Sequence, residues 1–598
     1  MKLTRTFDIL PYLKEKHNRP DTLNFKESGQ WRNYSTDEVI DIINNFSYGL
    51  LSIGIKKGDK VAIISANRPE WNFVDLACAQ IGVITVPMYP SLSSSDMAYI
   101  LNDAGVRLLF LDNAEIGAKI NEIKSQVPSL EKVSSFDALS DFELWNKYVE
   151  LGKQNPNPQE LKNISDSIEA SDLLTLIYTS GTTGLPKGVM LSHNNIMSNA
   201  KTGVDDAFTI YDSGMKALSF LPLCHIFERT IFHIYMLKGI GVYYAESMET
   251  IGENLKEIKP DCFSTVPRLL EKVFDKIVAT GNTLTGVKKK LFFWALDLGL
   301  RYELGGKNGV WYDMQLAIAN KLIFSKWREA LGGNVKLIVS GAAALQPRLA
   351  RVFTAAKIIV LEGYGLTETS PVISVNRLEE SNRAFGTVGT LFRDVEVKID
   401  TSDGVYAEGE GEILVKGPNV MMGYYNKPEL TKEVIDDDGW FHTGDVGKFV
   451  DGKFLKITDR KKEVFKTSGG KYIAPQPMEN KFKESVFIEQ IMVLGENQKF
   501  PGALVVPAWD VLEKWAKDNG IAFQSRSELV SKPEIKELYD NEINKFNEGF
   551  GQWEKVKRFE IMPDEWTIDG GEMTPTLKLK RKPILAKYAH YIDKIYAV

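Results

Sequence analysis

The sequence predicts an α/β protein with two parts. The larger, N-terminal domain holds parallel-type sheets with helices plus a small β module, and the smaller C-terminal domain is mobile and α+β. Three observations predict this class. Short β-rich runs alternate with helical patterns from about residue 59 to 370. Short strands punctuated by Gly and Asp follow at about 385–458, and charged amphipathic helices with a few strands fill 460–598.

The β-rich runs between 59 and 370 have the composition of buried strands. They are rich in Val, Ile and Leu, and many end in Gly, Pro, Ser or Asn. Strands of this kind, separated by helices, are typical of parallel sheets covered on both faces. The candidates are KVAIISAN, GVITVPMY, VRLLFLD, LLTLIYTS, KALSFLPL, CFSTVP, VKLIVSGAA and IIVLEGYG.

The later part of the chain predicts a β module and a second domain. FGTVGTLFRDVEVKID, GEILVKG and GKFLKITD are short alternating strands, which place the module at about 385–458. The run DRKKEVFKTSGGK is charged and rich in turn residues, so it suits a hinge. We therefore expect an N-terminal domain at 1–458 and a C-terminal domain at 459–598, with the hinge near Asp459.

Composition and charge exclude several classes of protein. With 598 residues and 43% hydrophobic residues, the chain can bury more than one core. A net charge of −6 gives no electrostatic footprint for nucleic acid. The three cysteines, Cys78, Cys224 and Cys262, lie far apart in apolar surroundings, which favours a reducing compartment over a disulfide framework or a zinc site.

The sequence shows no targeting or spanning segment. The N-terminus lacks a signal-peptide pattern, and no apolar run reaches about 18 residues. We expect a cytoplasmic protein, and peripheral contact with the inner face of a membrane stays open.

The stretch YTSGTTGLPKG at 178–188 is the strongest candidate for a binding site. Glycines let the backbone approach an anion, and successive amide groups can form an anion-binding nest. Thr179, Ser180, Thr182 and Thr183 add hydroxyl donors, and Lys187 adds a positive charge. Gly188 follows the lysine where a Walker loop has Ser or Thr. The alternative is a flexible surface loop, which the density of glycines and hydroxyls after a buried strand disfavours.

Two carboxylates are candidates for metal and sugar binding. In EGYGLTETSP, Glu368 lies among hydroxyls and suits a hard cation such as Mg²⁺, while Tyr364 offers a flat face for a base. In GWFHTGDVG, Asp445 lies between glycines and could accept hydrogen bonds from a ribose diol. Taken singly, Glu368 is more often a solvated loop acid, and Asp445 is more often part of an ordinary Asx-turn.

Two basic segments complete the set of candidates. DRKKEVFKTSGGK at 459–471 holds Arg460, Lys462 and Lys466 beside a double glycine, and MTPTLKLKRK at 573–582 holds Lys578 and Arg581. Either could meet phosphate, and either could be an ordinary basic turn or tail. The order of all five segments is more informative than any one of them.

These motifs, in this order, resemble the adenylate-forming superfamily of acyl-CoA synthetases, luciferases and adenylation domains. YTSGTTGLPKG is similar to its phosphate-loop signature, and YGLTET, TGD and DRKKEVFKTSGGKYIAP follow as they do in the family. The resemblance covers nearly the whole chain. LPLCHIFER at 221–229, with EGYGLTET, looks most like long-chain fatty acyl-CoA synthetases.

The C-terminal motif departs from the commonest form in the family. TPTLKLKR stands where a T-x-S-G-K-x-x-R pattern usually lies. With Thr574, Thr576 and Arg581 aligned, Lys578 matches the catalytic lysine and Leu577 replaces the usual glycine. Lys580 is the less favoured candidate.

The resemblance implies a role for each matching residue. The loop 179–187 would hold the β- and γ-phosphates of ATP, Thr179 and Glu368 would bind Mg²⁺, and His225 would lie near the acyl carboxylate and the thiol. Asp445 would bind the ribose with support from Arg460. The remaining nucleotide and coenzyme A positions implied by the resemblance are Gly181, Gly184, Gly341, Ala342, Ala343, Gly363, Gly365, Thr367, Lys462, Lys466, Gly469 and Gly470.

The reaction implied is activation of a fatty acid by ATP to acyl-AMP and pyrophosphate, followed by transfer of the acyl group to coenzyme A. Rotation of the C-terminal domain about Asp459 would exchange Lys578 for the Thr467–Gly470 side of that domain. One alternative is a fatty-acyl-AMP ligase that serves a carrier protein, and another is a ligase for medium-chain or aryl acids. Two further alternatives are a luciferase-like oxygenase and a nucleotide-binding regulator that catalyses no reaction. Joint retention of Lys187, Glu368, Asp445 and Lys578 argues against the regulator.

Two segments bear on the lipid substrate. FHIYMLKGIGVYY at 232–244 could line an alkyl tunnel or be ordinary core. VKKKLFFWAL at 287–296 could be an interfacial helix, although a core helix with a charged end is the favoured interpretation. The oligomeric state, including a homodimer, is left open.

Overall fold

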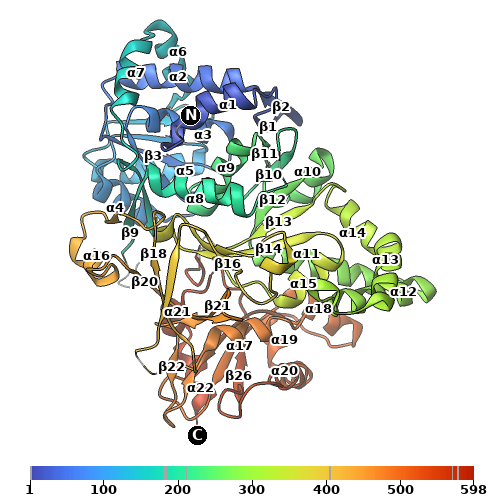
Figure 1. The fold of residues 1–598 in the computed structure, drawn as a ribbon. Helices are drawn as coiled ribbons and strands as arrows, with labels where there is room; N and C mark the ends of the chain where they lie inside the picture. The colour runs from blue at the N-terminus through green and yellow to red at the C-terminus, as the bar shows by residue number, and fades with distance from the viewer. Residues whose placement is uncertain are drawn as a thin grey trace. The chain divides into compact units, whose positions relative to one another are not determined.

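The structure, a computed structural model, confirms the predicted α/β class (Figure 1). It describes residues 3–179, 185–210, 212–402, 404, 406–568, 570–574 and 578–597. The chain divides into two compact units. Unit 1 comprises Met1–Val397 and Val415–Phe441, and unit 2 comprises Lys398–Leu414 and His442–Val598.

Unit 1 is built on two large sheets whose central strands are parallel. The eight candidate strands between 59 and 370 all form as predicted, because each is a short apolar run bounded by turn residues. The nine-stranded sheet has the order β16 (Thr390–Leu391), β15 (Val372–Val375), β14 (Ile359–Gly365), β13 (Leu337–Ser340), β12 (Cys262–Thr265), β10 (Lys216–Ser219), β11 (Gly241–Tyr244), β1 (Leu23–Glu27) and β2 (Gln30–Tyr34). The eight-stranded sheet has the order β19 (Gly423–Tyr424), β9 (Lys187–Ser192), β8 (Leu173–Thr179), β4 (Ile84–Met88), β3 (Lys60–Ile64), β5 (Leu108–Leu111), β6 (Lys132–Ser135) and β7 (Glu143–Leu144).

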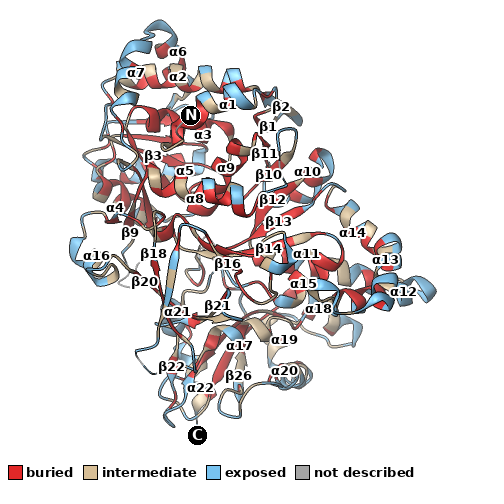
Figure 2. Cartoon of the chain, viewed as in Figure 1, coloured by how far each residue is buried: buried red, intermediate tan, exposed pale blue. Residues whose placement is uncertain are grey.

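Helices cover these sheets, and Figure 2 shows the strands buried beneath them. The described helices of unit 1 are α1 (Ile9–Lys16), α2 (Thr36–Ser52), α3 (Pro69–Gln80), α4 (Ser94–Ala104), α5 (Ala114–Ile123), α6 (Asn146–Gln154), α7 (Pro158–Asp166), α8 (His193–Asp206), α9 (Ile226–Lys238), α10 (Ile251–Ile258), α11 (Pro267–Thr283), α12 (Gly286–Leu300), α13 (Val310–Ala319), α14 (Ser325–Ala330), α15 (Pro347–Ala355) and α16 (Pro428–Val434).

Unit 2 is α+β. A four-stranded sheet has the order β17 (Glu396–Asp400), β18 (Gly411–Lys416), β20 (Phe441–Val450) and β21 (Phe454–Arg460). The other strands are β22 (Phe465–Lys466), β23 (Tyr472–Ile473), β24 (Ile488–Leu494), β25 (Gly502–Pro507) and β26 (Arg558–Ile561). The described helices are α17 (Pro475–Phe482), α18 (Trp509–Asp518), α19 (Arg526–Ser531), α20 (Pro533–Phe546), α21 (Arg581–Lys587) and α22 (Ala589–Tyr596).

The observed division differs in detail from the boundary expected at 459. Strand β21 pairs with β20 along its whole length, so residues 442–458 belong with the segment that follows them. The stretch predicted as one β module at 385–458 is also divided. Thr390–Leu391 extends the nine-stranded sheet and Gly423–Tyr424 extends the eight-stranded sheet. A pivot at Asp459 stays a prediction.

A buried ion pair fixes helix α9 against the eight-stranded sheet. The guanidinium of Arg229, which is fully buried, donates to both carboxylate oxygens of Asp75 at 3.0 and 2.5 Å and to the Thr175 hydroxyl at 2.8 Å. A buried charge needs a partner of this kind, and removing one partner is strongly destabilising. Arg229 in the LPLCHIFER motif therefore holds the helix in place.

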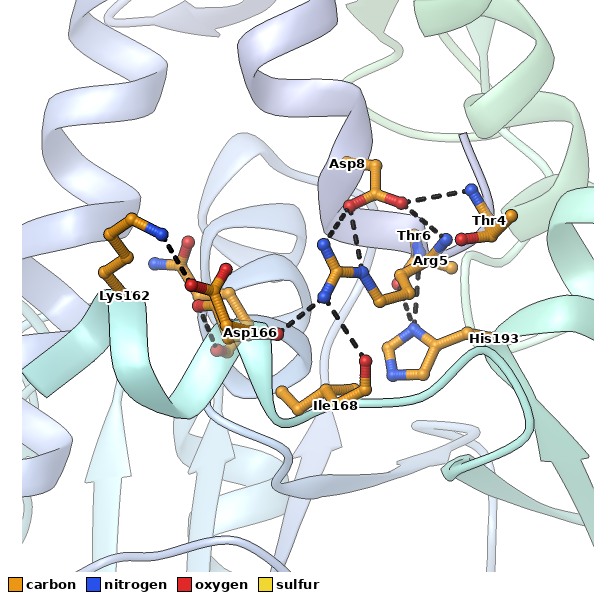
Figure 3. A network of polar contacts seen from close by, with 10 residues as sticks. Thr4, Arg5, Thr6, Asp8, Lys162, Asp166, Ile168 and His193 are labelled. Atoms are coloured by element: carbon orange, nitrogen blue, oxygen red, sulfur yellow. Dashed lines mark hydrogen bonds and ion pairs between the residues drawn. The ribbon is translucent and has the colours of Figure 1, made fainter. Parts of the chain in front are cut away.

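The first residues of the chain are fastened to the start of α8 and the end of α7 (Figure 3). Arg5 donates to the Asp8 carboxylate and to the Ser165 carbonyl at 2.6 Å. The Thr6 amide donates to Nδ1 of His193 at 3.2 Å, so the ring proton of the neutral imidazole lies on Nε2. Burial lowers the pKa of His193 to about 3, with Arg5 adding to the effect.

The depressed pKa of His193 predicts acid sensitivity. An unfolded histidine, with a pKa of about 6.5, takes up a proton before the folded one does, so stability falls as the pH drops below about 6.5 and continues to fall towards pH 3. We expect wild type to lose about 2 kcal/mol relative to His193→Gln between pH 7.5 and pH 5. Urea denaturation of both proteins at the two pH values checks this, and a constant difference between them would contradict it.

Candidate active site

In unit 1 the structure brings Thr179, Lys187 and Glu368 into one cluster. Thr179 at the end of β8 pairs in register with Lys187 at the start of β9. Strand β19 lies on the other side of β9, and the Met421 amide just before it donates to the Glu368 carbonyl at 2.8 Å. Three segments that are far apart in the sequence thus meet at the end of the phosphate-loop strand.

Tyr424 connects the lysine to the carboxylate. Its hydroxyl donates to Glu368 at 2.9 Å, and the Lys187 ammonium lies 4.0 Å from the centre of its ring. A cation over an aromatic face is attracted by the quadrupole of the ring. Burial, followed by the Glu368 charge, raises the pKa of Tyr424 well above its usual value. The hydroxyl therefore stays protonated and acts as a donor to Glu368.

The glycine after Lys187 has a packing reason. A Cβ at Gly188 would lie 3.0 Å from the Tyr178 ring, whose hydroxyl donates to Asp103 at 2.6 Å. The Cβ of a Ser or Thr, as found in a Walker loop, would therefore crowd the Tyr178 ring at this position. The rest of the loop, Ser180, Gly181, Thr182, Thr183 and Gly184, lies outside the described residues.

The loop carrying Glu368 is tightly organised. The Leu366 amide donates to the Thr369 hydroxyl at 2.9 Å, and that hydroxyl donates to the Pro371 carbonyl at 2.6 Å. A Cβ at Gly365 would lie 1.7 Å from the Pro371 oxygen, so no other residue fits there. Thr367 is buried beside Glu368 in the same short helix, η5 (Thr367–Thr369).

The remaining candidates of unit 1 lie at the carboxyl ends of neighbouring strands. Ser340 at the end of β13 pairs with Glu362 of β14, so Gly341–Ala343 and Gly363–Gly365 follow each other side by side. Ligands of α/β sheets bind at such strand ends. Ala342 has φ 68°, a left-handed conformation that a non-glycine residue adopts only where its surroundings impose it. Tyr364 is partly exposed.

His225 is the N-cap of α9. Its Nδ1 accepts from the Phe227 amide at 3.1 Å, and a Cβ at Gly341 would lie 3.2 Å from the Phe227 ring. The Thr230 hydroxyl of the same helix donates to the Ser370 carbonyl at 3.1 Å. The helix that His225 caps is therefore packed against both the Gly341 turn and the Glu368 loop. Residues 232–237, predicted as either tunnel or core, are buried within α9.

Unit 2 places Asp445 beside Arg460. The two residues are register partners on β20 and β21, and Arg460 Nε donates to Asp445 Oδ1 at 2.9 Å. Asp445 is only 4% exposed. Further along, Lys462, Gly469 and Gly470 lie exposed on turns. Lys466 lies exposed on β22, and its Nζ is 5.3 Å from the centre of the Tyr472 ring.

Lys578 is exposed, and its backbone is held on both sides. Its amide donates to the Thr574 hydroxyl at 3.0 Å, and its carbonyl accepts from the Thr574 amide at 2.8 Å. Arg581 anchors the start of α21 by an ion pair of 2.7 Å to buried Glu479. Thr576 and Leu577 lie outside the described residues.

Comparison with known proteins gives two family matches. Residues 14–425 match the family described as AMP-binding enzyme, and residues 462–598 match its C-terminal domain. The chain belongs to the AMP-binding enzyme family.

Named relatives of this AMP-binding enzyme are similar over most of their length. "Long-chain-fatty-acid–CoA ligase FadD15" of Mycobacterium bovis is 32% identical over 97% of this chain and 96% of its own. "Long chain acyl-CoA synthetase 6, peroxisomal" of Arabidopsis thaliana is 34% identical over 92% and 79%. The crystal structure of the adenylation domain of a carboxylate reductase from Mycobacterium chelonae has a TM-score of 0.80 and 22% identity over 99% of this chain and 91% of its own, which shows a shared fold.

Sequence reasoning missed Tyr424 in this AMP-binding enzyme. Its position in GYY, in a segment predicted as part of the β module, gave no sign that it lies beside the phosphate loop. Only the pairing of β19 with β9 brings it there.

The hydroxyl of Tyr424 predicts a measurable effect. Tyr424→Phe keeps the ring on Lys187 but removes the donor to Glu368, so we expect kcat for acyl-AMP formation to fall about fivefold, the size of one hydrogen bond. Tyr424→Leu removes both contacts and should lose more. Pyrophosphate release measures both rates, and equal rates for Tyr424→Phe and wild type would show that the hydroxyl does not act through Glu368.

Proposed function

We propose that this chain is an AMP-forming long-chain fatty acid–CoA ligase. The observation that carries the proposal is the cluster of Thr179, Lys187, Tyr424 and Glu368 at the end of the phosphate-loop strand. The similarity to curated long-chain ligases over nearly the whole chain supports the choice of substrate.

The first step activates the carboxylate. An oxygen of the fatty acid carboxylate attacks the α-phosphorus of ATP, the α–β bridging bond breaks, and the electron pair leaves with pyrophosphate. Both reactants are anionic, so cations and amide donors must stabilise the charge that moves onto the leaving group. Lys187, next to the phosphate loop, stabilises the negative charge of the leaving pyrophosphate. Lys578 of unit 2 stabilises the transition state through its positive charge rather than by acting as a base.

The residues present fit a magnesium ion. Glu368 supplies a carboxylate and Thr179 a hydroxyl, which are the hard oxygen ligands Mg²⁺ prefers beside phosphate. The described residues contain no group of three or more His, Cys, Asp or Glu that could hold a metal by itself. The ion would therefore bind through Glu368, Thr179 and phosphate oxygens, and when bound it would neutralise phosphate charge.

The second step transfers the acyl group. The thiol of coenzyme A attacks the carbonyl carbon of acyl-AMP, the mixed anhydride breaks, and AMP leaves with the electron pair while the thiol proton passes to solvent. Asp445 holds the ribose diol and Arg460 keeps the carboxylate in place. His225, at the start of α9, lies near the acyl carbonyl. Gly341–Ala343 and Gly363–Gly365 flank the adenine.

The C-terminal domain, residues 459–598, serves both steps by turning about Asp459. In one orientation Lys578 faces the nucleotide, and in the other the turn from Thr467 to Gly470 borders the pantetheine path. Lys462 and Lys466 remain near the nucleotide. Burial raises the pKa of Asp459 to about 7, and its Oδ1 accepts from the Arg460 amide at 2.6 Å. This hydrogen bond joins the proposed pivot to Arg460, the partner of Asp445.

The alternative function, that of a fatty-acyl-AMP ligase, differs in the molecule that accepts the acyl group. A fatty-acyl-AMP ligase would stop at acyl-AMP or pass it to a carrier protein. Purified protein with palmitate, ATP and Mg²⁺ should release AMP in proportion to added coenzyme A. AMP release that requires a carrier protein instead of coenzyme A would favour the fatty-acyl-AMP ligase over the CoA ligase.

The chain works in the cytoplasm, in peripheral contact with the inner face of a membrane. The substrate is an amphiphile that concentrates in bilayers, and the three cysteines are free and buried. No helix among the described residues is long and apolar enough to cross a bilayer. A monomer and a homodimer are both compatible with this location, and sedimentation of the purified chain measures its oligomeric state.

A further inference from the structure

Helix α13 turns large apolar side chains outward. Five of them, on α13 and the π-helical turn η4 (Asn320–Phe324), are at least half exposed, and we call them the outer stripe: Val310, Trp311, Met314, Ile318 and Leu322. Their spacing of mostly three or four residues places them on one face of the helix. Trp311 alone is 72% exposed.

The opposite face of the same helix is packed and hydrogen-bonded. The Tyr312 hydroxyl donates to the Leu298 carbonyl at 2.5 Å, Asn320 Nδ2 donates to the Ala355 carbonyl at 2.8 Å, and Phe324 is fully buried. These contacts to α12 and α15 fix the rotation of the helix. In Figure 2, parts of the α12 and α13 ribbons are coloured as exposed.

Exposed apolar residues are concentrated in this region. Of the sixteen large apolar side chains that are exposed in the described part of the chain, seven lie between residues 287 and 322. They are the outer stripe together with Val287 and Leu291 of α12. Scattered exposed apolar residues are normal, whereas a contiguous patch marks an interaction surface.

The charge around this patch is opposite in sign to that of the rest of the protein. Residues 286–326 hold seven basic and three acidic residues, a net charge of +4, while the whole chain carries −6. The basic residues are Lys288, Lys289, Lys290, Arg301, Lys307, Lys321 and Lys326. Two of the three acids, Asp297 and Glu303, are already paired with Arg301 and Arg351.

We propose that α12 and α13 form an anchor that docks on an anionic lipid surface. The outer stripe enters the boundary between headgroups and acyl chains, and the lysines bind lipid phosphates. An interfacial helix combines these two features, an apolar face and a lysine-rich flank. Within the 287–296 segment, Phe292 agrees with the favoured interpretation as a core helix, because it is buried and a Cβ at Gly281 would lie 2.1 Å from its ring. Phe292 belongs to the core, and the stripe on α13 makes the contact.

This inference deepens the proposed function, since a ligase on a bilayer meets its substrate where that substrate dissolves. The two claims can be tested apart. Formation of acyl-CoA from octanoate dissolved in water tests the ligase without lipid, and vesicle binding tests the anchor without turnover.

The test is co-sedimentation of the full chain with vesicles of phosphatidylcholine alone and of phosphatidylcholine with about one-third phosphatidylglycerol. Wild type should bind the anionic vesicles, and less so at high salt. The triple variant Trp311→Ser, Ile318→Ser, Leu322→Ser should bind at least about tenfold more weakly. The triple variant Lys288→Glu, Lys289→Glu, Lys290→Glu should lose the preference for anionic vesicles.

A matched control replaces exposed apolar residues of unit 2: Val486→Ser, Val511→Ser and Trp553→Ser. It should bind vesicles like wild type, and all variants should turn over octanoate at the wild-type rate, which shows that they fold. Wild-type binding by the stripe variant, or no binding by wild type, would overturn the anchor. A wild-type dimer that the stripe variant alone dissociates would instead make this face a contact between two copies, and would also overturn it.

Discussion

Lys578→Ala is expected to lower acyl-AMP formation at least about a hundredfold, while acyl transfer from supplied acyl-AMP to coenzyme A continues near the wild-type rate. The lysine stabilises charge that develops only as pyrophosphate leaves, so its loss affects one half-reaction. Pyrophosphate release measures the first step, and acyl-CoA formation from synthetic palmitoyl-AMP measures the second.

Lys580→Ala is the matched control for Lys578→Ala. Lys580 lies two residues away, and its amide donates to the Glu572 carbonyl at 2.7 Å, a backbone contact that the substitution keeps. We expect it to retain most of the first half-reaction. If Lys580→Ala were the more damaging variant, the alignment that selects Lys578 would be wrong. Equal loss of both half-reactions in Lys578→Ala would contradict the division of roles.

Glu368→Gln is expected to reduce acyl-AMP formation about a hundredfold and to raise the Mg²⁺ concentration needed for half the maximal rate. The amide oxygen can still accept from Tyr424, so the loop keeps its conformation while the negative charge is lost. Rates measured across a Mg²⁺ titration check the prediction. A lower rate with an unchanged dependence on Mg²⁺ would show that Glu368 does not bind the metal.

The elements and their motifs could largely be predicted from the sequence. The buried strands were visible because each is a short Val/Ile/Leu run that ends in a turn residue. The phosphate loop and the Glu368 loop each follow such a strand, and Asp445 was visible as an acid between glycines. These signals are local, since burial on both faces and turn chemistry act within a few residues.

What could not be predicted depends on pairing between distant segments. Tyr424 reaches Glu368 only because β19 adds to β9, and no local pattern specifies which strand a two-residue segment joins. The same holds for the predicted β module, because the strands that form between residues 385 and 458 are divided among three sheets. The outer stripe was missed because an apolar run in a helix normally predicts burial, and only the observed rotation of α13 shows which side faces outward.

The measurement that tests the account most directly is AMP formation with and without coenzyme A, across saturated fatty acids of increasing length. We predict AMP release that depends on coenzyme A, with kcat/KM rising about fourfold per added methylene until the acyl site is filled, and with long-chain acids the best substrates. AMP release that ignores coenzyme A, or a preference for short or aryl acids, would contradict the assignment as a long-chain fatty acid–CoA ligase.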